Sequence, residues 1–230
     1  MKKCTKIQFA GAILFTLLFA AFTVLVKVID VAAIGPEGAE VGFATINKAF
    51  HDWTGVSEFL HGISEITGVV ALATVGVFAL IGLIEWISRK NMFKVDSSIL
   101  VLGGLYLIVG AIYLIFTKVV VNYRPILEDG ALESSYPSSH TVLAIIVYFT
   151  AIVEFNELLA GSKIRILAWI GMGALLILTL VGRTFSGYHW LTDIIGGVIL
   201  SIALVLWFLA VRGFVHEKEK EKEDELRQDS

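Results

Sequence analysis

Residues 97–117 decide the fold class, because they read SSILVLGGLYLIVGAIYLIFT without a single Asp, Glu, Lys or Arg. A helix that crosses a bilayer needs about 20 consecutive apolar residues. Similar runs recur along the chain, and they predict six spans at about 7–28, 64–87, 97–117, 139–158, 164–182 and 190–213. Each span is expected to be helical, because the bilayer core offers no partner for open backbone groups. We therefore expect an all-α polytopic membrane protein, a bundle of six transmembrane helices.

The composition of the whole chain agrees with a membrane protein. Of its 230 residues 57% are hydrophobic and 17% are charged, and the mean hydropathy is +0.81. Soluble domains are about 45–50% apolar and about 25% charged, so an ordinary soluble globule, a disordered chain and a nucleic-acid binder are excluded. The single cysteine, Cys4, excludes an internal disulfide. The apolar run from Ile7 to Val26 exceeds the core of a signal peptide, so we expect a retained first helix.

The distribution of basic residues predicts the orientation. Of the 18 Lys and Arg residues, 13 fall at the two termini and in the loops at 88–96 and 159–165. Because basic residues concentrate on the cytoplasmic side, both termini are expected in the cytoplasm. The active loops described below are then expected outside the cytoplasm.

Two segments lie outside the spans. From Val41 to Leu60, within an interfacial segment of about 38–60, apolar side chains recur at helical spacing among charged ones. This pattern predicts an amphipathic helix on the outer interface, acting either as a lid or anchor or as a guide for a lipid. The membrane domain is expected to cover 1–216. Residues 217–230, rich in acids and bases, are expected to form a charged, poorly ordered cytoplasmic tail.

Polar residues cluster before the sixth span. His189 and Asp193 are four residues apart at a predicted helix start, so they share a face. A carboxylate there can orient the imidazole, and a neutral, oriented imidazole is a competent nucleophile. Arg183 precedes them across a short loop. Taken alone, these residues could equally make purely structural hydrogen bonds.

A second polar stretch, Pro137-Ser138-Ser139-His140, opens the fourth span. Proline and serine favour a helix start, and free backbone amides at a helix N-terminus attract anions. This pattern alone fits ordinary helix capping as well. Arg124 adds a guanidinium that can grip phosphate in a planar fork. Two arginines, two histidines and a carboxylate beside apolar spans together indicate a site that holds and attacks a phosphate.

The order and spacing of these residues resemble the type 2 phosphatidic acid phosphatase superfamily, whose signatures are Lys-x6-Arg-Pro, Pro-Ser-Gly-His and Ser-Arg-x5-His-x3-Asp. Three departures stand out. Only five residues separate Lys118 from Arg124, so that Thr117 occupies the register of the family lysine. Ser139 replaces the family glycine, and Gly182 replaces the family serine.

The resemblance implies a metal-independent lipid phosphatase that acts through a phosphohistidine. In this chain His189 would attack phosphorus, Asp193 would orient it, and His140 would protonate the leaving oxygen. The implied phosphate-binding residues are Arg124, Arg183, Ser138, Ser139, Lys118 and Thr117. No cofactor, metal, nucleic acid or obligatory protein partner is expected.

The implied substrate is a lipid phosphate drawn from the bilayer, namely phosphatidylglycerophosphate, undecaprenyl pyrophosphate or phosphatidic acid. Such chemistry serves phospholipid synthesis or the recycling of a cell-wall carrier. Two alternatives remain open from the sequence. One is a transporter or binding protein that holds a phosphate lipid without hydrolysis, and the other is a catalytically inactive relative.

Overall fold

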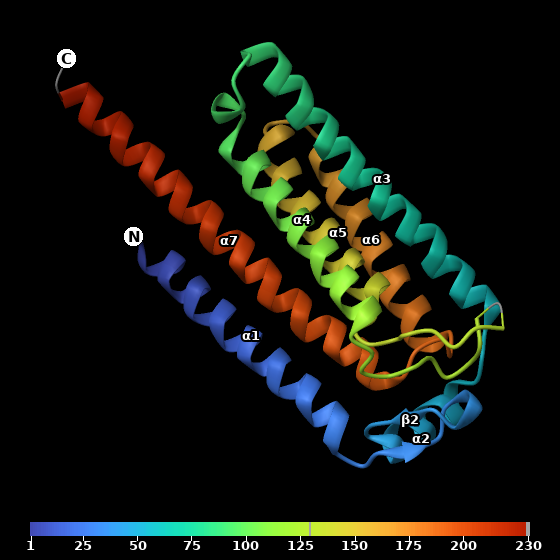
Figure 1. The fold of residues 1–230 in the computed structure, drawn as a ribbon. Helices are drawn as coiled ribbons and strands as arrows, with labels where there is room; N and C mark the ends of the chain where they lie inside the picture. Colours follow the sequence, from blue (N-terminus) through green and yellow to red (C-terminus); the bar gives the residue numbers. More distant parts are fainter. Residues whose placement is uncertain (129, 229–230) are drawn as a thin grey trace.

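The computed structural model describes residues 1–128 and 130–228, and helices dominate it (Figure 1). In chain order the helices are α1 (Lys3–Val28), α2 (Ala44–Thr54), α3 (Glu58–Arg89), α4 (Ser97–Lys118), α5 (Ser139–Leu158), α6 (Ile164–Phe185) and α7 (Leu191–Gln228). Two short antiparallel strands, β1 (Ala32–Ala33) and β2 (Glu40–Val41), precede α2. Single 3-10 turns cover Pro36–Gly38 and Met92–Lys94.

Six helices in the described part of the chain, all except α2, are long and apolar enough to cross a membrane. This confirms the predicted six-span, all-α architecture. The largest difference in where a span begins is at α3, which begins at Glu58 rather than near residue 64. That difference brings His61 into the first turn of a span.

The bundle has two inner helices, α5 and α7, whose most apolar windows are 50% and 56% buried, against 11% in α1 and 6% in α6. α7 packs between α1 and α5, while α6 packs against α3 and α5. The largest apolar core joins Phe78, Leu102, Ile146, Leu204 and Phe208. The outer helices leave long rows of apolar side chains exposed, which is the surface a lipid environment favours.

The connections separate into two groups at opposite ends of the bundle (Figure 1). Both chain termini and the turns at 90–96 and 159–163 lie at one end. The β1–β2 hairpin, α2, the long connection at 119–138 and the short one at 186–190 lie at the other. The two loops that carry the predicted phosphate chemistry are therefore neighbours in space.

The amphipathic helix is shorter than the sequence predicted. α2 covers only Ala44–Thr54, and the chain turns at Gly55, whose φ is 63°. Ser57 then caps α3 by accepting a hydrogen bond from the backbone amide of Leu60 at 3.4 Å. Leu60 thus belongs to the next helix, and capping at Ser57 explains why one continuous pattern forms two helices.

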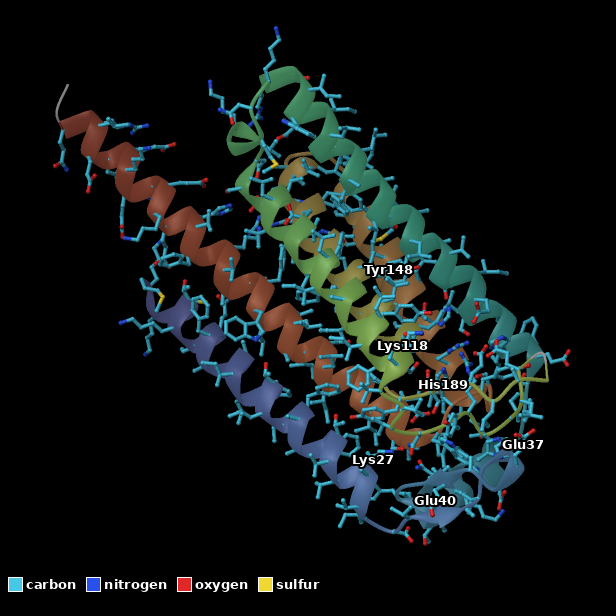
Figure 2. The ribbon with its side chains drawn as sticks, viewed as in Figure 1. Lys27, Glu37, Glu40, Lys118, Tyr148 and His189 are labelled. Atoms are coloured by element: carbon cyan, nitrogen blue, oxygen red, sulfur yellow. The ribbon has the colours of Figure 1, made fainter. Side chains whose placement is uncertain are left out.

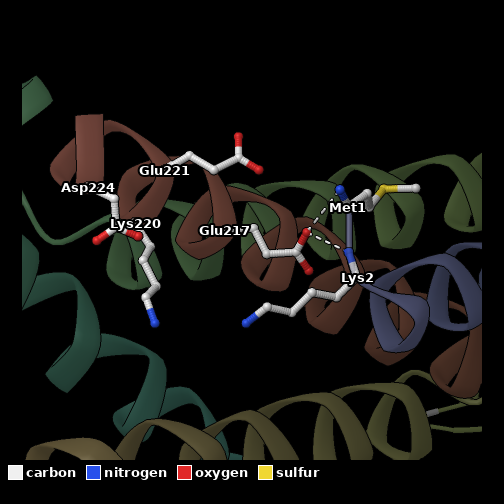
Figure 3. Close-up of a pocket in the computed structure, with 6 residues that line it drawn as sticks. All are labelled: Met1, Lys2, Glu217, Lys220, Glu221 and Asp224. Carbon is white, nitrogen blue, oxygen red and sulfur yellow. Dashed lines mark hydrogen bonds and ion pairs between the residues drawn. The ribbon is translucent and has the colours of Figure 1, made fainter. Parts of the chain in front are cut away.

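The expectation of a poorly ordered tail is wrong for the described residues, because α7 continues as a helix to Gln228. Its extension is tied to the N-terminus through Glu217, which accepts a hydrogen bond from the Lys2 backbone amide at 2.7 Å (Figure 3). Glu217 also accepts a hydrogen bond from Thr5 Oγ1 at 2.5 Å. Lys218 pairs with Glu221 at 2.7 Å, the kind of spacing that supports an exposed helix. Residues 229–230 lie outside the described chain.

Glu154, an acidic residue within the fourth predicted span, has partners inside the bundle. Ser98 Oγ donates to both oxygens of the buried Glu154, at 2.7 and 2.8 Å. Arg212 Nε donates to Ser98 Oγ at 2.8 Å and lies 3.3 Å from Glu154 Oε1. This network joins α4, α5 and α7, so Glu154 is compatible with a membrane helix because it is paired.

Candidate active site

The connection between α4 and α5 folds back on itself and presents Arg124. The Arg124 amide donates to the Glu133 carbonyl at 2.9 Å, and the Ser135 amide donates to the Asn122 carbonyl at 2.9 Å. Arg124 is 9% exposed. Its Nη1 lies 2.8 Å from Glu128 Oε2 and its Nε lies 3.4 Å from Glu133 Oε2. Arg124 is therefore held by two carboxylates from its own loop.

Asp193 lies in the first turn of α7, where its carboxylate caps the helix and faces His189. Asp193 Oδ2 accepts a hydrogen bond from the Trp190 amide at 3.0 Å, in the manner of a capping box. Its Oδ1 accepts from Asn122 Nδ2 at 3.2 Å. His189 Nδ1 lies 3.5 Å from Asp193 Oδ2. Asp193 thus has a structural role in addition to its position beside the imidazole.

α2 supports the same helix start from the outside of the bundle. Asn47 is fully buried; its Nδ2 donates to Thr192 Oγ1 at 2.9 Å, and its Oδ1 accepts from the Thr192 amide at 3.1 Å. The two bonds tie the middle of α2 to the residue before Asp193. The short interfacial helix therefore helps to position the carboxylate.

Arg183 is the largest fully buried side chain among the described residues, and α3 holds one end of it. Its Nη1 lies 3.0 Å from His61 Nδ1, 3.3 Å from Ser64 Oγ and 2.9 Å from Glu65 Oε1. Its Nε and Nη2 have no hydrogen-bond partner in the described chain. One edge of the guanidinium is therefore fixed by α3, and the other is free for an anion.

His140 lies in the first turn of α5 and contacts the same carboxylate. Its Nε2 is 3.3 Å from Glu65 Oε1. The ring packs directly on Gly68 of α3, where a Cβ atom would lie 2.6 Å from His140 Cδ2. Any residue larger than glycine at position 68 would displace the imidazole.

Further contacts connect the two arginines. The His61 ring stacks on Tyr188 with a centroid distance of 3.7 Å, and His61 Nε2 lies 3.9 Å from Glu128 Oε1. Since Glu128 contacts Arg124 and His61 contacts Arg183, a continuous series of polar contacts runs from the first loop to α6. The structure thus brings Arg124, His140, Arg183, His189 and Asp193 close together.

The serines at the start of α5 differ in their contacts. Ser138 is fully buried; its amide donates to the Asp193 carbonyl at 3.1 Å, and its Oγ accepts from Thr141 Oγ1 at 3.0 Å. Ser139 is the first residue of α5 and is partly exposed. The Ser138 contact joins the first turn of α5 to the first turn of α7.

Thr117 and Lys118 lie apart from this cluster. Both are exposed at the end of α4, and Figure 2 shows Lys118 there. Thr117 Oγ1 donates to the Leu114 carbonyl of its own helix at 2.8 Å. Over residues 1–128 and 130–228, no hydrogen bond or ion pair joins Lys118 to the arginines or histidines of the cluster. Neither Thr117 nor Lys118 therefore contacts the cluster as a counterpart of the family lysine would.

The electrostatic surroundings keep His189 neutral. Its side chain is 2% exposed, and burial lowers its pKa well below the usual value of 6.5. Arg183, Arg124 and His140 lower the pKa further, because each disfavours a second positive charge nearby. His189 Nε2 lacks a hydrogen-bond partner among the described residues, whereas Nδ1 faces Asp193 Oδ2 at 3.5 Å. A neutral imidazole with a free Nε2 near two guanidiniums is suited to attack an electrophile that carries negative charge.

The described residues contain no group of three or more His, Cys, Asp or Glu side chains arranged to hold a metal ion. Positive charge near the histidines comes instead from Arg124 and Arg183. Arg183 keeps Nε and Nη2 without a hydrogen-bond partner in the described chain, whereas the Arg124 guanidinium is ion-paired with Glu128 and Glu133. Buried donors without partners are costly, so the site is built for an oxyanion that would satisfy them.

The sequence analysis missed the contribution of α3. His61 and Glu65 lie one turn apart on this helix, and both contact the arginine and histidine cluster. A signal was present, because Glu65 interrupts an apolar run, and an ionisable residue inside a membrane helix indicates a functional site. The predicted start of the second span near residue 64 left His61 in a loop and concealed its relation to Glu65.

The structure thus combines six candidate membrane spans with a cluster of arginine and histidine side chains at one end of the bundle. Comparison with known proteins shows which family shares these features. Residues 118–216 match the model of the PAP2 superfamily, which confirms for this segment the family resemblance predicted from the sequence. The match begins at Lys118 and includes Arg124, His140, Arg183, His189 and Asp193. It does not include α3.

Two relatives illustrate the similarity. The phosphatidylglycerophosphatase B of Bacillus subtilis is 32% identical over 98 residues, which are 42% of this chain and 46% of that protein. The chain thus aligns with about half the length of this curated relative. The crystal structure of a transmembrane PAP2-type phosphatidylglycerolphosphate phosphatase from Bacillus subtilis superposes with a TM-score of 0.55, covering 90% of this chain and 96% of that one at 22% identity. This likeness extends the common fold to nearly the whole bundle.

Proposed function

We propose that this protein is a lipid phosphatase that hydrolyses a phosphate monoester or pyrophosphate of a membrane lipid. The observation that carries the proposal is the arrangement around Arg183. Its buried guanidinium keeps Nε and Nη2 unpaired beside a neutral His189. An anion-binding edge next to a nucleophile is what phosphoryl transfer requires, since its barrier is lowered mainly by positioning and by charge stabilisation.

The positions of the side chains support the following reaction. His189 attacks phosphorus as a neutral imidazole, and the bond from phosphorus to the lipid oxygen breaks. His140 transfers a proton to that oxygen, so that the lipid alcohol or lipid phosphate leaves uncharged at the broken bond. Asp193 stabilises the positive charge of the phosphohistidine. Water, activated by the now neutral His140, then attacks phosphorus, releasing inorganic phosphate and regenerating His189 and the protonated His140.

Phosphatidylglycerophosphate is the first substrate to test, because a relative that matches this chain is named for that reaction. Phosphatidic acid and undecaprenyl pyrophosphate present the same tetrahedral oxyanion to Arg124 and Arg183. Each substrate keeps its hydrocarbon tail in the bilayer. The lining of the site by membrane helices α3, α5, α6 and α7 suits such a substrate better than a soluble phosphate ester.

The proposed orientation places the active loops outside the cytoplasm. It rests on the excess of Lys and Arg at the end of the bundle that carries both termini. A reporter enzyme that works only outside the cytoplasm should be active when fused after Arg124. It should be inactive when fused after Gln228. The reverse pattern would overturn the orientation.

The decisive experiment compares the wild type with His189→Ala on all three lipid phosphates. Inorganic phosphate should be released from at least one of them by the wild type and from none by the variant. Brief incubation with a labelled substrate should also leave acid-labile phosphate on the wild-type chain. Equal release by both proteins would overturn the mechanism. Binding of the lipid without release would favour the transport or binding alternative.

A further inference from the structure

Glu65 is an ionisable residue on a membrane helix, and the proposed reaction gives it no role. It lies on α3, outside the residues that match the family, and its side chain is 44% exposed. Its surroundings are cationic, since Arg183, His140 and His61 all lie near its carboxylate. A carboxylate beside an anion-binding site repels the anion, so its presence there indicates a separate function.

The first possible purpose, holding Arg183, does not account for the whole geometry. Glu65 Oε1 lies 2.9 Å from Arg183 Nη1, an atom that His61 Nδ1 and Ser64 Oγ also contact. Arg183 is therefore fixed by three groups of α3, and the loss of one leaves two. The contact also leaves the free edge of the guanidinium, Nε and Nη2, unobstructed.

The second contact of the same oxygen is with His140. Glu65 Oε1 lies 3.3 Å from His140 Nε2, while Gly68 packs against the ring one turn further along α3. Glu65 and Gly68 lie on one face of α3 and therefore contact the imidazole on two of its sides. α3 thus positions His140 in the same way that Asp193, in the first turn of α7, positions His189.

The charges around His140 explain why a carboxylate is needed there. Arg183 Nη1 and His140 Nε2 both lie beside Glu65 Oε1, at 2.9 and 3.3 Å, and a guanidinium that close disfavours a second positive charge. Glu65 is the acidic group in direct contact with the ring. A carboxylate in contact with the imidazole favours its protonated form, which is the form that a general acid needs.

We propose that Glu65 is a positioning residue for His140, so that the site contains a second carboxylate–imidazole pair besides Asp193 and His189. Glu65 remains ionised throughout. It stabilises the imidazolium of His140 until the proton passes to the leaving oxygen. No proton is transferred to Glu65 itself. This inference rests on the phosphatase function proposed above.

The test uses two substrates that differ in their need for a general acid. One is a long-chain alkyl phosphate, whose alkoxide leaves only with a proton. The other is a nitrophenyl phosphate with an alkyl chain of equal length, whose phenolate leaves without one. Glu65→Gln should lower kcat/KM on the alkyl phosphate about 10- to 100-fold and leave kcat/KM on the aryl phosphate within about 3-fold, because general acid catalysis typically contributes 10²–10⁴-fold. The measure is kcat/KM because it reports the step that releases the leaving group, whereas kcat on both substrates also includes the attack of water that His140 assists.

A double-mutant comparison identifies the residue through which Glu65 acts. His140→Ala should show the same selective loss of kcat/KM on the alkyl phosphate. In that background, adding Glu65→Gln should have no further effect, since contacting residues that act as a unit are not additive. Glu128→Gln is the matched control, because Glu128 pairs with Arg124 and should change both substrates alike.

The outcomes are distinct. Equal loss of both substrates in Glu65→Gln would show that the carboxylate serves Arg183 or the fold, and would overturn the inference. Unchanged or increased activity would overturn it as well. An additive loss in the His140→Ala background would have the same meaning. A wild type that releases phosphate from neither substrate nor from any lipid phosphate would overturn the proposed function first and this inference with it.

Discussion

The backbone amide of Ser138 donates a hydrogen bond to the backbone carbonyl of Asp193 at 3.1 Å. These residues are 55 positions apart, and each stands at the start of a membrane helix. The bond fixes the N-terminus of α5 against the N-terminus of α7. The proposed proton donor His140 and the proposed nucleophile His189 are therefore anchored to a common point. Several predictions about activity and stability depend on this rigid arrangement.

Asp193→Asn should lower kcat by about 10³- to 10⁴-fold with little change in KM, because a neutral amide cannot stabilise the imidazolium. The amide oxygen can still accept the hydrogen bond of the Trp190 amide, so the helix cap should survive. Phosphate release and the thermal unfolding midpoint in detergent would be measured on the same preparation. A large fall in the unfolding midpoint would indicate a structural rather than a chemical effect.

Gly68→Ala should reduce kcat at least 10-fold, because its Cβ would lie 2.6 Å from Cδ2 of His140. Gly76→Ala on the same helix is the matched control, since nothing lies within 4 Å of a Cβ at that position. The control should keep full activity and gain about 0.5–1 kcal/mol of stability, the usual difference between alanine and glycine inside a helix. Full activity in Gly68→Ala would contradict the described packing.

Restoring the family serine at position 182 should harm this protein. A Cβ at Gly182 would lie 2.8 Å from the Leu60 carbonyl oxygen and 3.2 Å from Ser64 Cβ. The backbone of α3 would have to move, and with it the groups that hold Arg183. Gly182→Ser and Gly182→Ala should therefore lose activity to a similar degree, whereas Gly173→Ala should not. A gain of activity in Gly182→Ser alone would show that the missing hydroxyl matters more than the close packing.

The stability of the protein should fall in acid through His189. Its pKa is lowered in the folded state, so the unfolded chain binds the proton more tightly. The contribution of His189 is then complete above pH about 6.5 and is lost as the pH falls, by up to about 1.4 kcal/mol per pH unit. The unfolding midpoint in detergent should drop between pH 7 and pH 5. His189→Gln should weaken this dependence, and an identical dependence in the variant would disprove the assignment.

Phosphatase activity should persist in excess EDTA, because Arg124 and Arg183 supply the positive charge that phosphoryl transfer needs. Phosphate release would be measured with EDTA and after subsequent addition of magnesium. Complete loss in EDTA with recovery in magnesium would defeat the proposal of a metal-independent reaction. The folded state should be monitored in parallel, so that a loss of structure is not mistaken for a loss of metal.

The sequence was sufficient to predict the spans, because apolar runs of bilayer length leave the backbone little choice other than a helix. It also identified Arg124, His140, Arg183, His189 and Asp193 as one group, since their spacing matches a family pattern. The contacts of α3 could not be predicted in this way. Glu65 and Gly68 meet His140 only through helix packing, which depends on the relative rotation of α3 and α5. The helical tail was missed for a related reason, because its bonds to Lys2 and Thr5 join opposite ends of the chain.

The length of α7 has a practical consequence. Its 38 residues correspond to about 57 Å of helix, well beyond the roughly 30 Å thickness of the hydrocarbon layer. The final turns form a rigid arm that begins next to the N-terminus and leads away from the catalytic loops. A fluorescent protein or affinity handle attached at this end would be carried on a stiff spacer. It would therefore leave the route by which lipids approach the opposite end unobstructed.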